Sequence, residues 1–176
     1  MLLLTVSGPP GSGTSTLVGK LCEDRGCSSV NGGDIFREQA SERGLSVAEF
    51  SALCKQDLDV DRSLDDILKQ VMSDPDGPEV VESRLCGWWA EELGLSCLRI
   101  WVSVSEEERA RRIQNREGGD YQTSLEISRQ RQSDDMERYR ELYGIDLDDM
   151  RPYNLVVDAD ELDAEGVFAI VSAALR

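Results

Sequence analysis

A short apolar run that leads directly into a glycine-rich loop is the feature that most constrains this chain. Residues 2–6 read LLLTV, which predicts a buried strand, and residues 8–13 read GPPGSG. Residues 14–18, TSTLV, then begin a predicted helix. Glycine lets the backbone turn so that several N–H groups point at one anion, and a helix start adds further unpaired N–H groups. The stretch therefore predicts a loop that binds phosphate.

The spacing of this loop fits G-x-x-x-x-G-K-[ST] at every fixed position but one. Gly8, Gly13 and Ser15 occupy their expected places, whereas Thr14 replaces the lysine that reaches the β- and γ-phosphates. An ordinary Gly/Pro turn is the alternative, but the flanking segments and the hydroxyl groups favour phosphate binding. The residues assigned to nucleotide binding are Gly8, Pro9, Pro10, Gly11, Ser12, Gly13, Thr14, Ser15 and Thr16.

The composition and net charge of the chain exclude histidine chemistry, disfavour nucleic-acid binding and suggest a salty environment. The 176 residues, enough for one well-buried domain, include 35 acidic and 19 basic side chains and no histidine, for a net charge of -16. Histidine catalysis and histidine metal ligation are therefore excluded, and the acidic surface disfavours binding to nucleic acid. Because only three of the basic residues are lysines, we expect a halophile protein that salt stabilises by screening its own charge.

The cysteines and the apolar runs indicate a cytoplasmic protein. The five cysteines are odd in number and form no C-x-x-C motif, so we expect buried free thiols rather than disulfides or a zinc site. The N-terminal apolar run is short and lacks a basic start, and no run is long enough to span a membrane. We therefore expect no membrane association.

Strand and helix patterns alternate along the chain, which predicts an α/β fold with a parallel sheet covered on both faces. Strands are expected at residues 2–6, 27–30, 79–83, 97–102 and 154–158. Helices are expected at 15–25, 34–43 (with Asp34 as its N-cap), from Ser46 onward, and at 61–72, 85–93, from 105 to the glycines at 118–119, 123–143 and 163–176. The segment 32–78 is nearly all short helices, so it forms a small helical subdomain.

Several arginines are placed where they could bind phosphate. Arg37 lies one turn into a helix after a glycine turn, and Arg84 follows a strand, at the edge where open α/β sheets bind ligands. Arg109, Arg112 and Arg116 share one helix face. Each arginine taken alone fits a surface ion pair equally well, but together they favour a site for several phosphates.

A second helix face carries Arg131, Asp135 and Arg138 at spacings of four and three. These side chains could hold a phosphate and accept a hydrogen bond from a base amine or a sugar hydroxyl, or they could form a solvated ion-pair ladder. Near the phosphate loop, Glu82 could orient Mg²⁺ beside Ser15, or it could be a buried carboxylate that caps the loop backbone.

These segments occur in an order that resembles the archaeal type of cytidylate kinase. The resemblance covers residues 2 to about 158 and rests on SGPPGSG at 7–13, GDIFR at 33–37, ESRLCGW at 82–88, RARRI at 109–113, RY at 138–139 and YGID at 143–146. It implies a P-loop NTPase fold with a five-stranded parallel sheet, in a single domain. The core would comprise 1–31, 79–108 and 131–176, with a helical insert that binds the nucleoside monophosphate at 32–78 and a small lid at about 109–130.

The resemblance also implies the reaction, in which ATP and CMP or dCMP give ADP and CDP or dCDP with Mg²⁺. By position, the substrate-binding residues would be Asp34, Arg37, Arg84, Arg131, Asp135 and Arg138. Arg84, Arg112, Arg116 and Arg131 would act in phosphoryl transfer, and Ser15 and Glu82 would hold the metal. Thr14 replaces the loop lysine of many P-loop kinases, as threonine also does in some archaeal relatives, and Asn31 stands where the family usually has serine.

Two alternatives stay open at this point. The chain could be a P-loop kinase for another small acceptor, such as AMP, UMP or a metabolite hydroxyl, or a nucleotide-binding regulator that lost catalysis with its lysine. The many phosphate-binding arginines favour an active kinase. We expect ATP and CMP or dCMP as its partners and a monomeric state.

Overall fold

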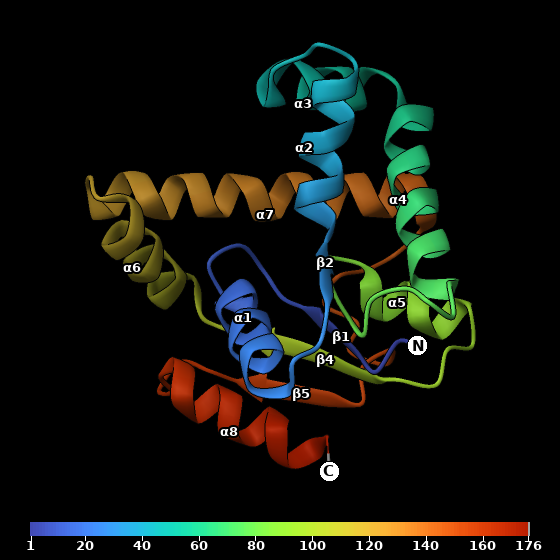
Figure 1. The fold of residues 1–176 in the computed structure, drawn as a ribbon. Coiled ribbons are helices and arrows are strands. Elements are labelled where there is room, and N and C mark those ends of the chain that lie inside the picture. Colours follow the sequence, from blue (N-terminus) through green and yellow to red (C-terminus); the bar gives the residue numbers. More distant parts are fainter. Residues whose placement is uncertain (176) are drawn as a thin grey trace.

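A five-stranded parallel sheet forms the centre of the computed structural model, which describes residues 1–175 apart from the side chains at 47, 48, 51 and 55. The order of the strands across the sheet is β2-β3-β1-β4-β5, and Figure 1 labels four of them. Their bounds are β1 Leu4–Ser7, β2 Ser29–Asn31, β3 Val80–Glu82, β4 Leu98–Ser103 and β5 Leu155–Asp158. The predicted α/β class and the five-stranded parallel sheet are confirmed.

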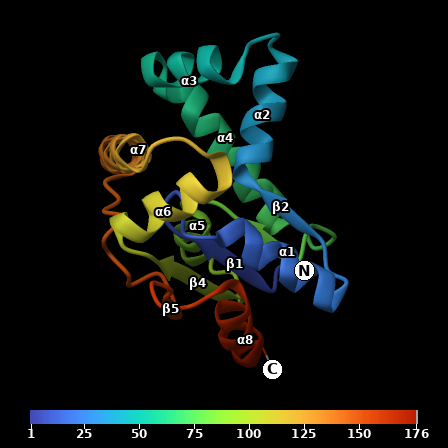
Figure 2. The same ribbon diagram turned by 90° about the vertical axis from the view of Figure 1, so that its left-hand side faces the viewer.

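The described residues form eight helices, of which α3 lies away from the sheet (Figure 2). They are α1 Thr14–Arg25, α2 Gly32–Glu42, α3 Val47–Gln56, α4 Leu58–Ser73, α5 Cys86–Glu92, α6 Glu106–Glu117, α7 Tyr121–Tyr143 and α8 Ala164–Ala174. Successive strand residues point to opposite faces of the sheet, so Val80 packs with α1 and α8 whereas Val81 packs with α4, α5 and α7. Both faces are therefore covered, as the sequence pattern predicts.

The helices α2, α3 and α4 project from the sheet as one group (Figure 1). Ala40, Phe50 and Cys54 are buried in a small core of their own, while Leu68 and Met72 near the end of α4 join the main core. The group corresponds to the helical segment 32–78 expected from the sequence. It is attached to the sheet through β2 at one end and through α4 at the other.

Most helix starts follow the predicted capping residues, with a few differences. Ser46 and Glu49 form the expected capping box before α3. The predicted N-cap Asp34 is wrong, because α2 begins two residues earlier and the Asn31 side chain accepts from the Gly33 N–H at 2.7 Å. The α4 helix begins at Leu58 rather than at residue 61, since Asp57 caps it. Similarly, Asp120 caps α7, which begins at Tyr121 instead of Thr123.

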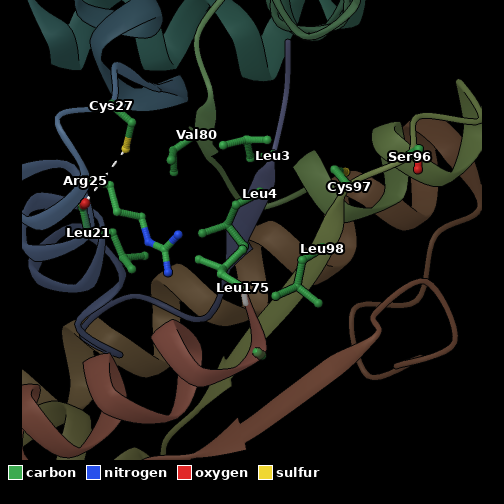
Figure 3. Close-up of a pocket in the computed structure, with 11 residues that line it drawn as sticks. Leu3, Leu4, Leu21, Arg25, Cys27, Val80, Ser96, Cys97, Leu98 and Leu175 are labelled. Carbon is green, nitrogen blue, oxygen red and sulfur yellow. Dashed lines mark hydrogen bonds between the residues drawn. The ribbon is translucent and has the colours of Figure 1, made fainter.

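The five cysteines are free thiols, and two of them, Cys54 and Cys86, are buried. The prediction of buried thiols is wrong for the other three, which are only partly buried. Cys27 and Cys97 both line a hollow of about 380 Å³ at the ends of the strands far from the glycine-rich loop, with the Arg25 guanidinium among leucine side chains (Figure 3). Within the described residues, no helix is long and apolar enough to cross a membrane.

Candidate functional site

The glycine-rich loop presents an open helix N-terminus. Gly11 and Gly13 have φ values of 85° and 90°, a left-handed conformation that a residue with a Cβ adopts only at a cost. Gly13 is also the N-cap of α1, and no side chain caps this helix. The first N–H groups of α1 are therefore available to an anion, and the first turn carries no acid that would repel one.

Ser15 and Glu82 lie together beside this loop. The Ser15 hydroxyl donates to Glu82 Oε1 at 2.7 Å, and Asn31 Nδ2 donates to Glu82 Oε2 at 2.7 Å. The strand register places Glu82 beside Asn31 and next to Val6 of β1, and Ser15 reaches Glu82 from the first turn of α1. Among the described contacts, Glu82 accepts from side chains and not from the loop backbone, so the alternative of a backbone cap is not supported.

A hollow of about 720 Å³ opens next to the loop, between α6 and the segment that follows β5. Its walls combine backbone of the loop, side chains of α6 and the turn that leads into α8. The lining residues are 11–17, Glu108, Arg112, Ile113, Arg116, 160–164 and Val167. The predicted nucleotide-binding loop and two of the predicted arginines therefore share one cavity.

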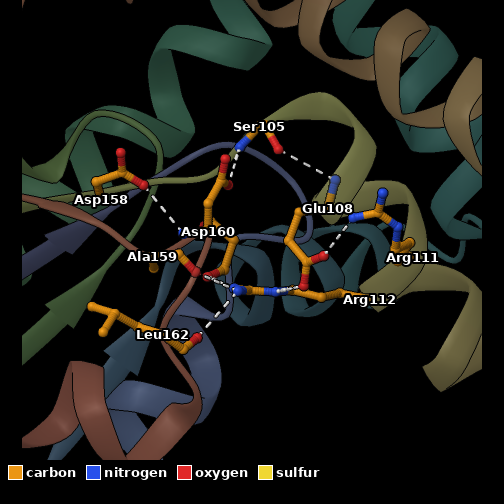
Figure 4. A network of polar contacts seen from close by, with 9 residues as sticks. Ser105, Glu108, Arg111, Arg112, Asp158, Ala159, Asp160 and Leu162 are labelled. Atoms are coloured by element: carbon orange, nitrogen blue, oxygen red, sulfur yellow. Dashed lines mark hydrogen bonds and ion pairs between the residues drawn. The ribbon is translucent and has the colours of Figure 1, made fainter.

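Arg112 is held tightly in the wall of this cavity. Its Nη1 donates to the Ser12 carbonyl at 3.2 Å, and its Nη2 donates to the Ala159 carbonyl at 2.5 Å and more weakly to Leu162 (Figure 4). Its Nε donates to Glu108 at 3.0 Å, and this hydrogen bond lowers the pKa of the Glu108 carboxyl. Arg112 thus joins the phosphate loop to the segment after β5. The sequence does not reveal this bridge, because backbone carbonyls carry no residue-specific pattern.

The other two arginines of this helix face have different environments. Arg116 has an exposed side chain that pairs, among the described residues, with its neighbour Glu117. Arg109 is 4% exposed, and its Nη1 donates to the Ser128 hydroxyl of α7 at 3.3 Å. Arg109 therefore packs against α7, whereas Arg112 and Arg116 of the same predicted helix face line the cavity.

A second polar cluster joins β3, α7 and the helical group. Arg84 Nε donates to Asp135 Oδ2 at 3.0 Å, and Arg138 Nη2 donates to Asp135 Oδ1 at 3.2 Å. Arg138 Nε also lies 3.3 Å from Asp61 Oδ2 on α4. Desolvation raises the pKa of Asp61, against the opposing effect of the Arg138 cation. The pair of Asp135 and Arg138 is thus part of a partly buried network rather than a solvated ladder.

The remaining predicted residues lie at the margins of this cluster. Arg131 is exposed on α7 and makes no described contact with Asp135 or Arg138. Arg37 donates to Asp34 within the first turns of α2, and both side chains are exposed. Asp61 was not predicted, because an acid in the first turn of an amphipathic helix is an ordinary sequence feature.

The fold and the loop define the class of the protein. Residues 4–140 match the family model described as an AAA domain. A gluconokinase from Sinorhizobium meliloti has a TM-score of 0.62 at 16% identity, covering 99% of this chain and 91% of its own. A shikimate kinase from Bacteroides thetaiotaomicron gives 0.62 at 14% identity, covering 99% and 98%. The chain therefore has the fold of the P-loop kinases.

Full-length relatives narrow this class to one family. A cytidylate kinase of Methanocaldococcus jannaschii is 38% identical over 99% of this chain and 97% of its own length. A cytidylate kinase of Natronomonas pharaonis is also 38% identical, over 99% and 90%. The chain belongs to the cytidylate kinase family, which confirms the resemblance drawn from the ordered motifs.

Proposed function

We propose that this protein is an ATP-dependent phosphotransferase that transfers the γ-phosphoryl group of ATP to CMP and dCMP. The observation that carries the proposal is the pairing of two sites at one edge of the sheet. The open N-terminus of α1 fits the phosphates of a donor nucleotide, and the cluster around Asp135 fits an acceptor. Glu82, which accepts from Ser15 of the loop, precedes Arg84 of the cluster by two residues. The cytidylate kinase relatives supply the identity of the acceptor.

On the donor side, residues Gly8 to Thr16 would surround the phosphates of ATP. Arg116 would move over these phosphates and supply part of the charge that Thr14 lacks. Arg112 would hold the loop in place, because it donates to backbone carbonyls on both sides of the cavity. Phosphoryl transfer depends mainly on positioning and charge neutralisation, so a chain without histidine can perform it.

The donor set beside the loop fits Mg²⁺. Ser15 and Glu82 offer a hydroxyl and a carboxylate, which are the hard oxygen ligands that Mg²⁺ prefers. No group of three or more acids, cysteines or histidines that could hold a metal occurs in the described part of the chain. In kinase sites, Mg²⁺ is usually bound by one or two carboxylates together with the substrate phosphates. Bound Mg²⁺ would neutralise charge on the β- and γ-phosphates.

On the acceptor side, Arg84 and Arg138 would bind the monophosphate nucleotide, with Asp34 and Arg37 approaching from α2. Arg131 would reach this nucleotide or the transferred phosphoryl group from α7. We assign residues 32–78 to the acceptor-binding insert, about 109–130 to the lid, and the rest of the chain to the core. We also propose that the protein is a cytoplasmic monomer.

An assay of ADP release with a series of candidate acceptors tests this function. We expect ADP release to require both ATP and an acceptor, and to be fastest with CMP and dCMP among the common nucleoside monophosphates. A coupled ADP assay in low and molar potassium chloride measures it. Equal or greater activity with AMP, or with a sugar or small-metabolite hydroxyl, would replace this proposal with the alternative acceptor. ATP binding without turnover on any acceptor would indicate a regulator.

A further inference from the structure

A buried carboxylate and a buried guanidinium nitrogen face each other without a hydrogen bond between them. Asp61 Oδ2 and Arg138 Nε are 3.3 Å apart and form an ion pair. Both atoms are shielded from solvent, and neither has a hydrogen-bond partner in the structure. Asp61 as a whole is only 5% exposed. A buried unsatisfied donor beside a buried unsatisfied acceptor is costly and rare in native proteins.

The neighbouring acids are satisfied, which distinguishes Asp61 from them. Both oxygens of Asp135 accept hydrogen bonds from arginines. Both oxygens of Asp65, one turn further along α4, accept from Trp89 Nε1 at 3.3 Å and from the Tyr143 hydroxyl at 2.7 Å. Asp61 is therefore the acid of this cluster that has a buried oxygen without a hydrogen-bond donor, and it belongs to the helical group that we assign to the acceptor.

The chemistry of this pair matches one edge of an amino-pyrimidine. An ionised carboxylate only accepts hydrogen bonds, and a guanidinium only donates them. Cytosine offers its 4-amino group as a donor directly beside the N3 acceptor, whereas uracil offers the O4 acceptor beside an N3–H donor. A carboxylate next to a guanidinium thus fits cytosine and opposes uracil in the same orientation.

We propose that Asp61 accepts a hydrogen bond from the 4-amino group of the acceptor base while Arg138 donates to the ring, so that Asp61 sets the preference for cytosine over uracil. The proposal rests on the function proposed above and adds the residue that selects the base. Both oxygens of Asp135 already accept hydrogen bonds from arginines. Asp135 would therefore bind the sugar hydroxyl or position Arg84 and Arg138.

The test compares two acceptors that differ at the amino group. The wild-type protein is assayed with CMP, with UMP and with the CMP analogue whose base lacks the 4-amino group, at saturating ATP. We expect kcat/KM for the analogue to be about 10- to 100-fold below that for CMP, the effect of one hydrogen bond to a charged group. For Asp61→Asn, we expect this ratio to fall to within about threefold and the ratio of UMP to CMP to rise, since an amide can donate to O4.

Asp59→Asn is the matched control, because Asp59 lies in the same first turn but has an exposed side chain that pairs with Arg62. It should keep the wild-type preference. If thermal melting shows that Asp61→Asn does not fold, Asp61→Ser is used instead, because it removes the same charge with a smaller side chain. We expect the same reduced ratio of kcat/KM for CMP to that for the analogue. A folded Asp61 variant that keeps the full preference for CMP over the analogue would overturn the proposal, as would a wild type that uses both equally. A wild type without activity on CMP would instead contradict the proposed function.

Discussion

Asp135→Ala is expected to lower kcat/KM for CMP by about 30- to 1000-fold, corresponding to a loss of about 2–4 kcal/mol. Asp135 accepts from Arg84 at 3.0 Å and from Arg138 at 3.2 Å, and the side chains of Asp135 and Arg84 are each 19% exposed. Removing the shared carboxylate leaves two partly buried cations without their common partner. Both arginines would then lose the orientation in which they meet the acceptor nucleotide.

Steady-state kinetics with CMP and ATP varied separately measure this effect. KM for ATP should stay nearly unchanged, because the donor loop makes no described contact with Asp135. Glu137→Ala is the matched control, since Glu137 is an exposed acid on the same helix, and it should behave like the wild type. Normal CMP kinetics in a folded Asp135→Ala protein would show that the acceptor site lies elsewhere.

Arg116→Ala should reduce kcat by about 10- to 100-fold, the value of one charge-assisted contact made mainly in the transition state. The phosphate loop carries Thr14 where its motif has lysine, so the positive side chain that the motif places at the γ-phosphate has to come from another element. Arg116 lines the same cavity and has a side chain that is 65% exposed, so it is free to move onto the phosphates. Arg112 is already engaged by backbone carbonyls and cannot do so without leaving them.

Single-turnover rates at saturating ATP and CMP separate this chemical step from nucleotide binding and product release. Arg111→Ala serves as the control, because Arg111 is an exposed arginine on the same helix that pairs with Glu108 at 3.1 Å. Thr14→Lys in the Arg116→Ala background should restore part of the rate by returning the missing charge to the loop. An unchanged rate in Arg116→Ala would mean that the charge comes from a different side chain.

The sequence predicts the scaffold of this protein because the scaffold depends on local patterns. Apolar strands beside glycines define β1 and the phosphate loop, and the capping box at Ser46 places the start of α3. The pairing of Ser15 with Glu82 also follows, since both flank the carboxyl ends of neighbouring parallel strands. The family resemblance adds the order of motifs, which no single loop supplies.

The contacts across the site depend on packing that the sequence does not encode locally. Helical spacing groups Arg109 with Arg112 and Arg116, yet the approach of α7 to α6 buries Arg109 against Ser128. The bridge from Arg112 to the Ala159 carbonyl involves main chain 47 residues away. Asp61 is likewise an ordinary first-turn acid until the fold places α4 beside Arg138.

The most direct test of the central claim follows the transferred phosphoryl group itself. The purified protein is incubated with ATP labelled at its γ-phosphate, CMP and Mg²⁺, and the products are separated. We expect the label to appear in CDP, in amounts equal to the ADP formed, and we expect no transfer when Mg²⁺ is chelated. Label recovered only as inorganic phosphate, with CMP unchanged, would contradict the claim.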